Sequence, residues 1–280
     1  YPPQRWGLIT GFHMMAGGLG SMAATLPVEW SLSVLSWQGL FFWLAGACLV
    51  PERGVAAPTG SLADQFRITG KVLTDGFYWR IQPLLGAQQL TFIACITLWI
   101  GPWLRDVGGI TDKAARADIQ LWTTAIMTAG FALSGVVTNA FRRIGVSDFA
   151  SAGVTSFLFI LVCAWLTVAP GFHPTIAWLL FGFLGALPIQ FMPLMVQSFP
   201  ANYAGRVSTS SNLVIFSVIF AGQWAIGKIV DQFPRTATGY APDGYTWAFG
   251  ALVILQVAGL AWLVLSRAHP MARPALAAAD

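Results

Sequence analysis

Apolar residues gather along the chain in eight long runs that are bounded by charged residues, proline or glycine. A helix needs about 20 apolar residues to cross the hydrocarbon layer of a bilayer, so each run predicts a membrane-spanning helix. The predicted spans are residues 6–28, 31–50, 81–104, 119–141, 149–169, 175–197, 207–227 and 245–266. No acidic, lysine or arginine residue lies well inside a run, as expected when a central charge costs about 2.5–3.5 kcal/mol. The predicted fold class is therefore all-α, a polytopic membrane helix bundle.

The composition agrees with a membrane protein. Of the 280 residues, 56% are hydrophobic and 9% are charged, and the mean hydropathy is +0.67. About a quarter of the residues of an average soluble chain are charged, so most of this surface is expected to face lipid. The net charge is +4, but the 15 basic residues form no basic patch, so we expect no nucleic-acid partner.

The three cysteines are predicted to be packing or lipid-facing residues. Cys48, Cys95 and Cys163 each lie inside an apolar run. Their spacing is not that of a metal site or of a disulfide frame. Sequence motifs typical of enzymes are also missing, since there are no paired intramembrane carboxylates and no GxSxG, HExxH or Walker A lysine. We therefore expect no metal, no cofactor and no enzymatic activity.

The distribution of basic residues predicts the orientation of the spans. An even number of spans places both termini on the same side of the membrane, and lysine and arginine accumulate in cytoplasmic loops. The side of the termini carries Arg5, Arg53, Arg67, Lys71, Arg80, Arg142, Arg143, Arg206, Arg267 and Arg273. The other side carries Arg105, Lys113, Arg116, Lys228 and Arg235. This excess predicts that both termini lie in the cytoplasm.

One long connection divides the spans into two plus six. It runs from Pro51 to about Trp79 and is mixed in charge. The expected organisation is two helices in residues 1–50, a cytoplasmic central loop at 51–79, a six-helix bundle at 80–268 and a cytoplasmic tail at 269–280. Within the loop, residues 62–73 either form a short amphipathic helix at the membrane surface or belong to a solvated connector.

Three local patterns occur in order along this topology. Residues 37–42 (WQGLFF) open the second span, residues 139–145 (NAFRRIG) join the fourth and fifth spans, and residues 204–208 (AGRVS) lead into the seventh. That seventh span continues with Asn212, Gln223, Gly227 and Asp231. The ordered set resembles the major facilitator superfamily: the entry to its sixth helix, the basic loop between its helices eight and nine, and its eleventh helix. The loop departs from the family pattern, since residues 139–141 stand where the family usually has an Asp-Arg pair and a glycine.

The resemblance implies a function and a place in a longer chain. It implies secondary active transport of a small organic solute by alternating access, in the cytoplasmic (inner) membrane of a bacterium. The spans then correspond to helices 5 to 12 of a twelve-helix protein, and residues 1–50 hold the last two helices of its N-terminal bundle. The chain begins with Tyr1 rather than Met, so we expect a fragment. The expected partners are the lipid bilayer, the solute with a proton or another coupling ion, and the missing N-terminal helices of the same protein.

Polar side chains within the spans are the candidates for the solute pathway. Gln88, Thr91, Cys95 and Trp99 share one face of the third span, and Ser208, Asn212 and Gln223 share one face of the seventh. In the sixth span, Gln190 lies near Pro193, which is expected to kink the helix. The predicted pathway residues are Gln88, Gln89, Trp99, Gln190, Asn212 and Gln223.

The alternative for each of these residues is a hydrogen bond between helices, worth about 0.6 kcal/mol. Because Gln88 and Gln89 cannot face the same way, at least one of them is expected to hold helices together. His13 is the histidine that lies deep in a span, and it is a candidate for proton coupling or a neutral packing residue. Arg142 and Arg143 are the basic residues of the cytoplasmic loop motif, and we expect them to pair with acidic groups or helix ends.

A second function remains open on the sequence alone. The chain could be a non-transporting polytopic membrane protein, such as a sensor or an assembly partner, whose polar residues only hold helices together. A polar, water-accessible lumen would distinguish the transporter from this alternative.

Overall fold

The computed structural model describes residues 62–236 and 239–266 and a few isolated residues between Met15 and Gly46. The elements are α3 (Leu62–Leu73), α4 (Gly76–Ala94), η2 (Cys95–Trp99), α5 (Ile100–Asp106), α6 (Lys113–Arg143), α7 (Asp148–Val168), α8 (Pro174–Ala186), η3 (Leu187–Gln190), α9 (Phe191–Gln197), η4 (Ala201–Tyr203), α10 (Ala204–Val230) and α11 (Pro242–Leu265). The all-α fold class is confirmed for these residues. Apart from those isolated residues, the first two predicted spans, and with them His13 and Cys48, lie outside the described residues.

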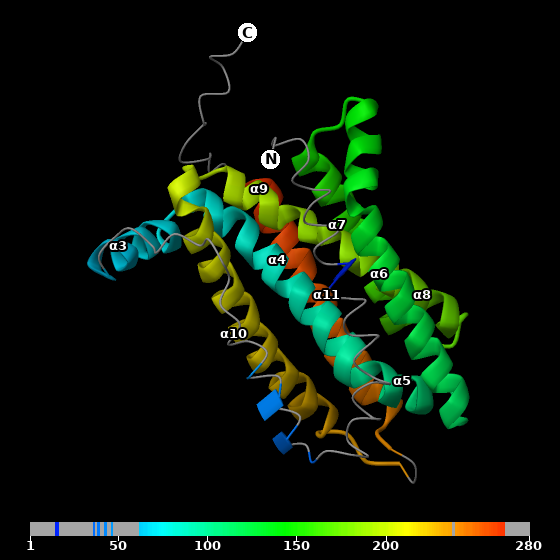
Figure 1. Cartoon of the computed structure of the whole chain (residues 1–280). Coiled ribbons are helices and arrows are strands. Elements are labelled where there is room, and N and C mark those ends of the chain that lie inside the picture. The colour runs from blue at the N-terminus through cyan, green and yellow to red at the C-terminus, as the bar shows by residue number, and fades with distance from the viewer. Residues whose placement is uncertain are drawn as a thin grey trace.

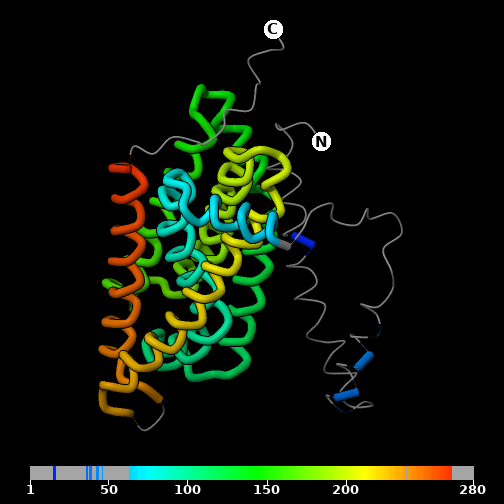
Figure 2. The backbone as a smooth tube through the Cα atoms, turned by 90° about the vertical axis from the view of Figure 1, so that its left-hand side faces the viewer, coloured from blue at the N-terminus to red at the C-terminus, as the bar shows by residue number. Residues whose placement is uncertain are grey.

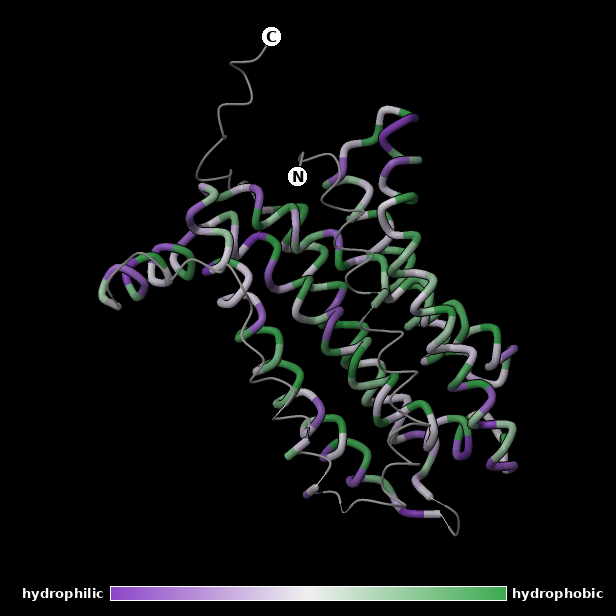
Figure 3. Tube along the Cα trace, in the orientation of Figure 1, coloured by the Kyte–Doolittle hydropathy of each residue, from purple (hydrophilic) through white to green (hydrophobic). Residues whose placement is uncertain are grey.

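Six helical segments of the described part are long and apolar enough to cross a membrane. They are Gly76–Asp106, Lys113–Arg143, Asp148–Val168, Pro174–Gln197, Ala201–Val230 and Pro242–Leu265. Each covers nearly all of one of the six spans predicted between residues 81 and 266. Figure 3 shows that hydrophobic residues dominate these segments, whereas hydrophilic residues collect toward their ends. These helices identify an integral membrane protein, and the total of eight spans stays a prediction.

The six segments run side by side along one axis and alternate in direction (Figures 1 and 2). The starts of α4, α7 and α10 therefore lie at the same end of the bundle as the last residues of α6, α9 and α11. We call this end the α3 end, because α3 lies there across the axis of the bundle, and the opposite end the α5 end.

Side chains from outside the helices set where three of the spans begin. Asp75 accepts a hydrogen bond from the backbone N–H of Tyr78 at the start of α4. Asp112 and Ser147 cap α6 and α7 in the same way. The first N–H groups of a helix have no intrahelical acceptor, so such caps satisfy donors that would otherwise be left at the membrane boundary.

Residues 62–73 form a helix and not an irregular connector, which were the two alternatives that the sequence left open for this segment. Val72 of α3 is fully buried, whereas Phe66 is 75% exposed. Arg67 pairs with Asp64 at 3.0 Å on its polar side, and Gln65 accepts a hydrogen bond from Arg206 of α10. The helix is amphipathic, as expected for a segment at a membrane surface; its contact with lipid stays a prediction.

The spanning helices pack in a definite order. The most extensive contacts join α6 to α8, α8 to α7, α7 to α11, α11 to α4 and α4 to α10. In this order α6 and α10 stand at the two edges, and they are the least buried of the spanning helices. The segment Gly76–Asp106 runs through the middle of the bundle and is the most buried (Figure 1).

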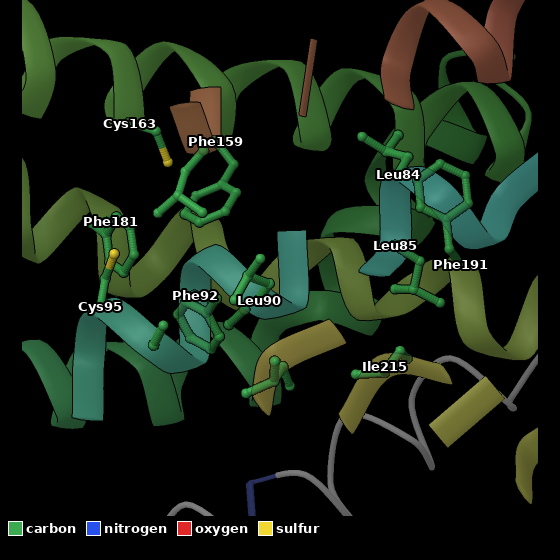
Figure 4. Packing of buried hydrophobic residues seen from close by; sticks show 14 of the residues in the cluster. Leu84, Leu85, Leu90, Phe92, Cys95, Phe159, Cys163, Phe181, Phe191 and Ile215 are labelled. Atoms are coloured by element: carbon green, nitrogen blue, oxygen red, sulfur yellow. The ribbon is translucent and has the colours of Figure 1, made fainter. Parts of the chain in front are cut away.

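Aromatic rings fill the core where α4, α7 and α8 meet. Phe92, Phe159 and Phe181 come from these three helices, and their ring centroids lie 5.1–6.2 Å apart (Figure 4). Cys95 and Cys163 are free, buried thiols beside this cluster. Of the two roles predicted for the cysteines, these two have the packing role.

Candidate functional site

Two of the spanning segments depart from α-helical geometry at corresponding places. The segment Gly76–Asp106 passes from α4 into the π-helical turn η2, and the segment Pro174–Gln197 passes from α8 into the 3₁₀ turn η3. Each turn is followed by a last α-helical piece of 7 residues, α5 or α9. Irregular backbone at membrane depth is tolerated in transporters where it lines a cavity. The two turns are therefore the centre of the candidate site.

Two prolines lie at the second departure from α-helical geometry, Pro188 and Pro193. The predicted kink was at Pro193, which lies three residues after the last residue of η3 in the same continuous helical run. Its missing N–H leaves the carbonyl of Ile189, within η3, without its usual i→i−4 partner. Pro188 lies within η3 itself, where its missing N–H and its ring are incompatible with a continuous α-helix.

Gln190 closes the 3₁₀ turn and is only 6% exposed. Its Oε1 accepts a hydrogen bond of 2.7 Å from Oγ1 of Thr138 on α6. Its Nε2 is buried and has no hydrogen-bond partner among the described residues. Leaving such a donor unpaired costs about 1–3 kcal/mol, so its presence at a helix interruption points to a role in ligand binding.

Trp99 occupies the equivalent place at the end of the π-helical turn. Its ring contacts Tyr240 and Tyr245, with centroid distances of 6.5 Å and 6.1 Å. Its Nε1 is also buried without a hydrogen-bond partner in the part of the chain that the structure describes. Both turns of the candidate site therefore carry one buried N–H donor.

The two donors lie near opposite ends of the bundle. At 1.5 Å per residue, Gln190 lies about 10 Å from the α3 end of its segment, and Trp99 lies about 10 Å from the α5 end of its own. Gln88 lies about 16 Å from Trp99 along α4 and η2. The structure thus does not bring the predicted pathway residues together into a single cluster.

Gln88 makes hydrogen bonds that fit its packing alternative. Its Nε2 donates to the backbone oxygen of Ser156 on α7 (3.2 Å), and its Oε1 accepts from Oγ of the same serine (2.9 Å). Gln82, which sequence reasoning missed, makes the same pair of bonds to Ser211 of α10 (3.3 Å and 2.9 Å). Because both glutamines are buried, the two pairs fasten α4 to its neighbours. Gln89 is only half-buried.

Asn212 and Gln223 lie on α10, at the edge of the bundle. Asn212 is exposed and Gln223 is half-buried. Phe216 and Phe220 on the same side of the helix are 62% and 79% exposed. No described helix covers this face, so it faces lipid, water or parts of the protein outside the described residues.

Arg142 and Arg143 lie at the end of α6, at the α3 end of the bundle. Arg142 forms a bidentate pair with Asp148 at the start of α7, with N–O distances of 3.2 Å and 2.7 Å. The expected pairing with an acidic group is therefore confirmed for Arg142. Arg143 is exposed. The connection between the two helices turns at Gly145, whose φ of +82° favours glycine.

A charged cluster beside Trp99 was missed at the sequence level. The side chain of Asp106, at the end of α5, is only 1% exposed. It accepts hydrogen bonds from Nε and Nη2 of Arg105 (2.6 Å and 3.0 Å), from the backbone N–H of Tyr240 (3.0 Å) and from the Tyr245 hydroxyl (2.8 Å). This carboxylate therefore ties α5 to α11 and to the connection that precedes it.

The polar groups that the candidate site offers for binding are uncharged. Charged residues lie toward the ends of the spanning segments, and the polar groups at the two interrupted turns are an amide and an indole. Within residues 62–236 and 239–266 no three histidine, cysteine or acidic residues gather as metal ligands would. The sequence matches no model of a known protein family and no curated protein.

Proposed function

We propose that this chain is part of a secondary active transporter of the major facilitator superfamily, which moves a small organic solute across a membrane by alternating access. Its spans then correspond to helices 5 to 12 of the whole protein. The solute pathway includes the two interrupted helices and the open face of α10.

The packing of the helices supports this proposal because it has the symmetry of an internal repeat. The first repeat is α4–α5, α6 and α7, and the second is α8–α9, α10 and α11. Exchanging the repeats turns the contact of α6 with α8 into that of α10 with α4, and the contact of α11 with α4 into that of α7 with α8. The contact of α7 with α11 maps onto itself. Since α4 and α8 run in opposite directions, the repeat is inverted, as in many transporters.

The turns η2 and η3 lie at matching places in this repeat. This is the observation on which the proposal rests. The first helix of each repeat changes its hydrogen-bond pattern shortly before its end, to a π-helical turn at η2 or a 3₁₀ turn at η3. A π-helical turn inside an α-helix is frequent at functional sites, and a 3₁₀ stretch within a helix often marks a functional hinge. Gln190 adds a buried amide donor at η3. A solute with hydrogen-bond acceptors, such as hydroxyl, carbonyl or carboxylate oxygens, fits the donors at these turns.

Replacing Gln190 with leucine is expected to reduce transport about fivefold or more, because the variant loses a donor to the solute worth about 1–3 kcal/mol. The full-length protein is expressed in cells, and uptake of radiolabelled sugars, organic acids and amino acids into membrane vesicles identifies the solute. The matched control is Gln88→Leu, which removes hydrogen bonds between α4 and α7. The control should keep at least half of the rate. Equal rates for the wild-type protein and the Gln190→Leu variant would exclude Gln190 from the pathway.

A cysteine at position 212 is expected to react with a charged, membrane-impermeant maleimide. A lumen holds the water that a thiol needs to form the reactive thiolate. The control is Leu161→Cys on α7, because Leu161 is 48% exposed and lies at a similar depth. Both variants are made with Cys48 replaced by serine, and the remaining cysteines, Cys95 and Cys163, are buried.

The two cysteine variants also separate the transporter from the alternative of a sensor or an assembly partner. Labelling of position 212 at least about ten times faster than position 161 supports a water-filled lumen on the α10 face, because the thiolate forms only in water. If neither position is labelled, α10 faces lipid or protein there, and the polar residues of α10 hold helices together.

A further inference from the structure

A groove of about 470 Å³ opens between three helices at the α3 end of the bundle. Its walls are the first residues of α7, the last residues of α11 and Arg80 of α4, and they include Phe149, Gly153, Phe157, Leu260 and Val264. Every lining residue except Arg80 is apolar or glycine. From Phe149 to Phe157 the groove follows α7 for about 12 Å. It is therefore an apolar groove with one positive charge.

The guanidinium of Arg80 is held in a fixed place at the head of this groove. Its Nε donates to the backbone oxygen of Leu263 (3.0 Å), and its Cζ lies 5.0 Å from the centroid of the Phe149 ring. These two contacts come from the two helices that form the walls. Arginine recognises phosphate oxygens through its planar set of donors, so the groove has a phosphate-binding group at the end where its apolar walls begin.

Two tryptophans place the head of the groove at the boundary of the membrane. Trp79 and Trp262 are 40% and 51% exposed, and Nε1 of Trp262 donates to the backbone oxygen of Trp79 (2.7 Å). Exposed indoles with one polar contact are typical of the membrane–water interface. Arg80 follows Trp79 in the chain and bonds to Leu263, which follows Trp262. The guanidinium is thus at headgroup level, and the apolar walls extend into the hydrocarbon layer.

The walls are open to the surroundings of the bundle. Phe157 and Val264 are 49% and 70% exposed, and Val154 is 42% exposed. A molecule dissolved in the bilayer therefore reaches the groove from the side. Among the described residues, the α3 end carries six basic residues (Arg67, Lys71, Arg80, Arg142, Arg143 and Arg206) against three acidic ones (Asp64, Asp75 and Asp148), whereas the α5 end carries five of each sign. Such an excess attracts anionic lipids to this end of the bundle.

We propose that this groove binds an anionic phospholipid, with one acyl chain between α7 and α11 and the phosphate on the guanidinium of Arg80. The lipid links the start of α7 to the end of α11 and to α4. This binding does not depend on the proposed transport, and it assigns a lipid to the end of the bundle that the basic residues predict to be cytoplasmic.

Two substitutions test the two halves of the proposal. Arg80→Gln removes the positive charge, and Gly153→Leu fills the apolar groove. The second variant is expected to fold, because a Cβ added at Gly153 meets no atom within 4 Å. Arg143→Gln is the matched control, since Arg143 is an exposed basic residue at the same end of the bundle.

The full-length protein, delipidated in detergent, is titrated with phosphatidylglycerol, phosphatidylcholine or glycerol phosphate, and bound lipid is counted by native mass spectrometry. We expect Arg80→Gln to weaken phosphatidylglycerol binding at least fivefold and Gly153→Leu to weaken binding of both lipids, with less than a twofold change for Arg143→Gln. Wild-type affinity in both Arg80→Gln and Gly153→Leu would overturn the site. Equal affinity of the wild-type protein for both lipids would overturn the preference for an anionic lipid, and tight binding of glycerol phosphate alone would show a phosphate site instead.

Discussion

Replacing Asp106 with alanine is expected to lower the free energy of unfolding by about 1–3 kcal/mol, the cost of leaving buried hydrogen-bonding groups without a partner. The side chain of Asp106 is 1% exposed and accepts hydrogen bonds from Arg105, Tyr240 and Tyr245. Alanine leaves the Tyr245 hydroxyl and the Tyr240 N–H without this acceptor. It also leaves the Arg105 guanidinium without its counter-charge.

The effect should be large because these partners come from separate parts of the chain. Tyr240 and Tyr245 lie 134 and 139 residues away from Asp106 in the sequence. The carboxylate of Asp106 therefore links the segment Gly76–Asp106 to the segment Pro242–Leu265 at the α5 end of the bundle. Without it, the connection before α11 loses its anchor, and the aromatic contacts of Trp99 with both tyrosines weaken as well.

Asp231→Ala is the matched control for this prediction. Asp231 also pairs with an arginine at the α5 end, but the side chains of Asp231 and Arg235 are 49% and 71% exposed. Exposed pairs of this kind are worth about 0.3–0.5 kcal/mol. Unfolding of the purified protein in detergent is followed by tryptophan fluorescence as denaturant is added. Equal midpoints for the two variants would mean that the Asp106 cluster contributes no more than a surface ion pair.

The spans could be predicted from the sequence because their signal is local. Length and apolar composition are sufficient to identify a membrane-crossing helix, and six predicted spans recur as helices with ends that differ by a few residues. The amphipathic pattern of residues 62–73 likewise gave the bounds of α3 as one of two alternatives, the other being a solvated connector. These elements depend on residues near one another in the chain, and this is the information that a periodic pattern contains.

The breaks within the helices could be predicted only in part. The sixth predicted span contains both Pro188 and Pro193, and a proline disrupts a helix only where its N–H would have found an acceptor. The structure shows that both prolines lie inside one continuous helical run, so both stand at such a place. The π-helical turn at Cys95–Trp99 contains neither proline nor glycine, but Pro102 follows it in α5. Because Pro102 has no N–H, the carbonyl of Leu98 in the turn lacks its usual i→i−4 partner, a local signal that the sequence analysis did not use.

The hydrogen-bond partners of the polar residues could not be predicted from the sequence, for a different reason. Gln88 and Gln82 bond to serines that are 68 and 129 residues away, and which helix each glutamine faces depends on the packing of the whole bundle. A glutamine side chain is costly to expose to lipid. Its presence within a span therefore indicates that it has a hydrogen-bond partner, but not which residue that partner is. That signal was present for Gln82 and Gln256 as well, and both are buried.

Replacing Gly182 with alanine is expected to lower the free energy of unfolding by about 1–3 kcal/mol, and replacing it with leucine by more, because overpacking forces neighbouring atoms apart. A Cβ at Gly182 of α8 would lie 2.6 Å from the backbone oxygen of Thr123 on α6. At Gly130 of α6, a Cβ would lie 2.8 Å from the backbone oxygen of Phe183 on α8. The obstacle is backbone in both cases, so no side chain can move aside and the two helices must separate.

Gly227→Ala on α10 provides the comparison, because a Cβ there meets nothing within 4 Å. Alanine is favoured over glycine in helices by about 1 kcal/mol, so this variant should be as stable as the wild-type protein or slightly more so. Thermal unfolding midpoints in detergent rank the variants as Gly227→Ala, Gly182→Ala and Gly182→Leu in decreasing order. In the inverted repeat, the pair of α6 and α8 corresponds to the pair of α10 and α4. The close contact at Gly182 therefore lies within one of these two matching helix pairs. A Gly182→Leu protein as stable as the Gly227→Ala protein would show that α6 and α8 are not in backbone contact.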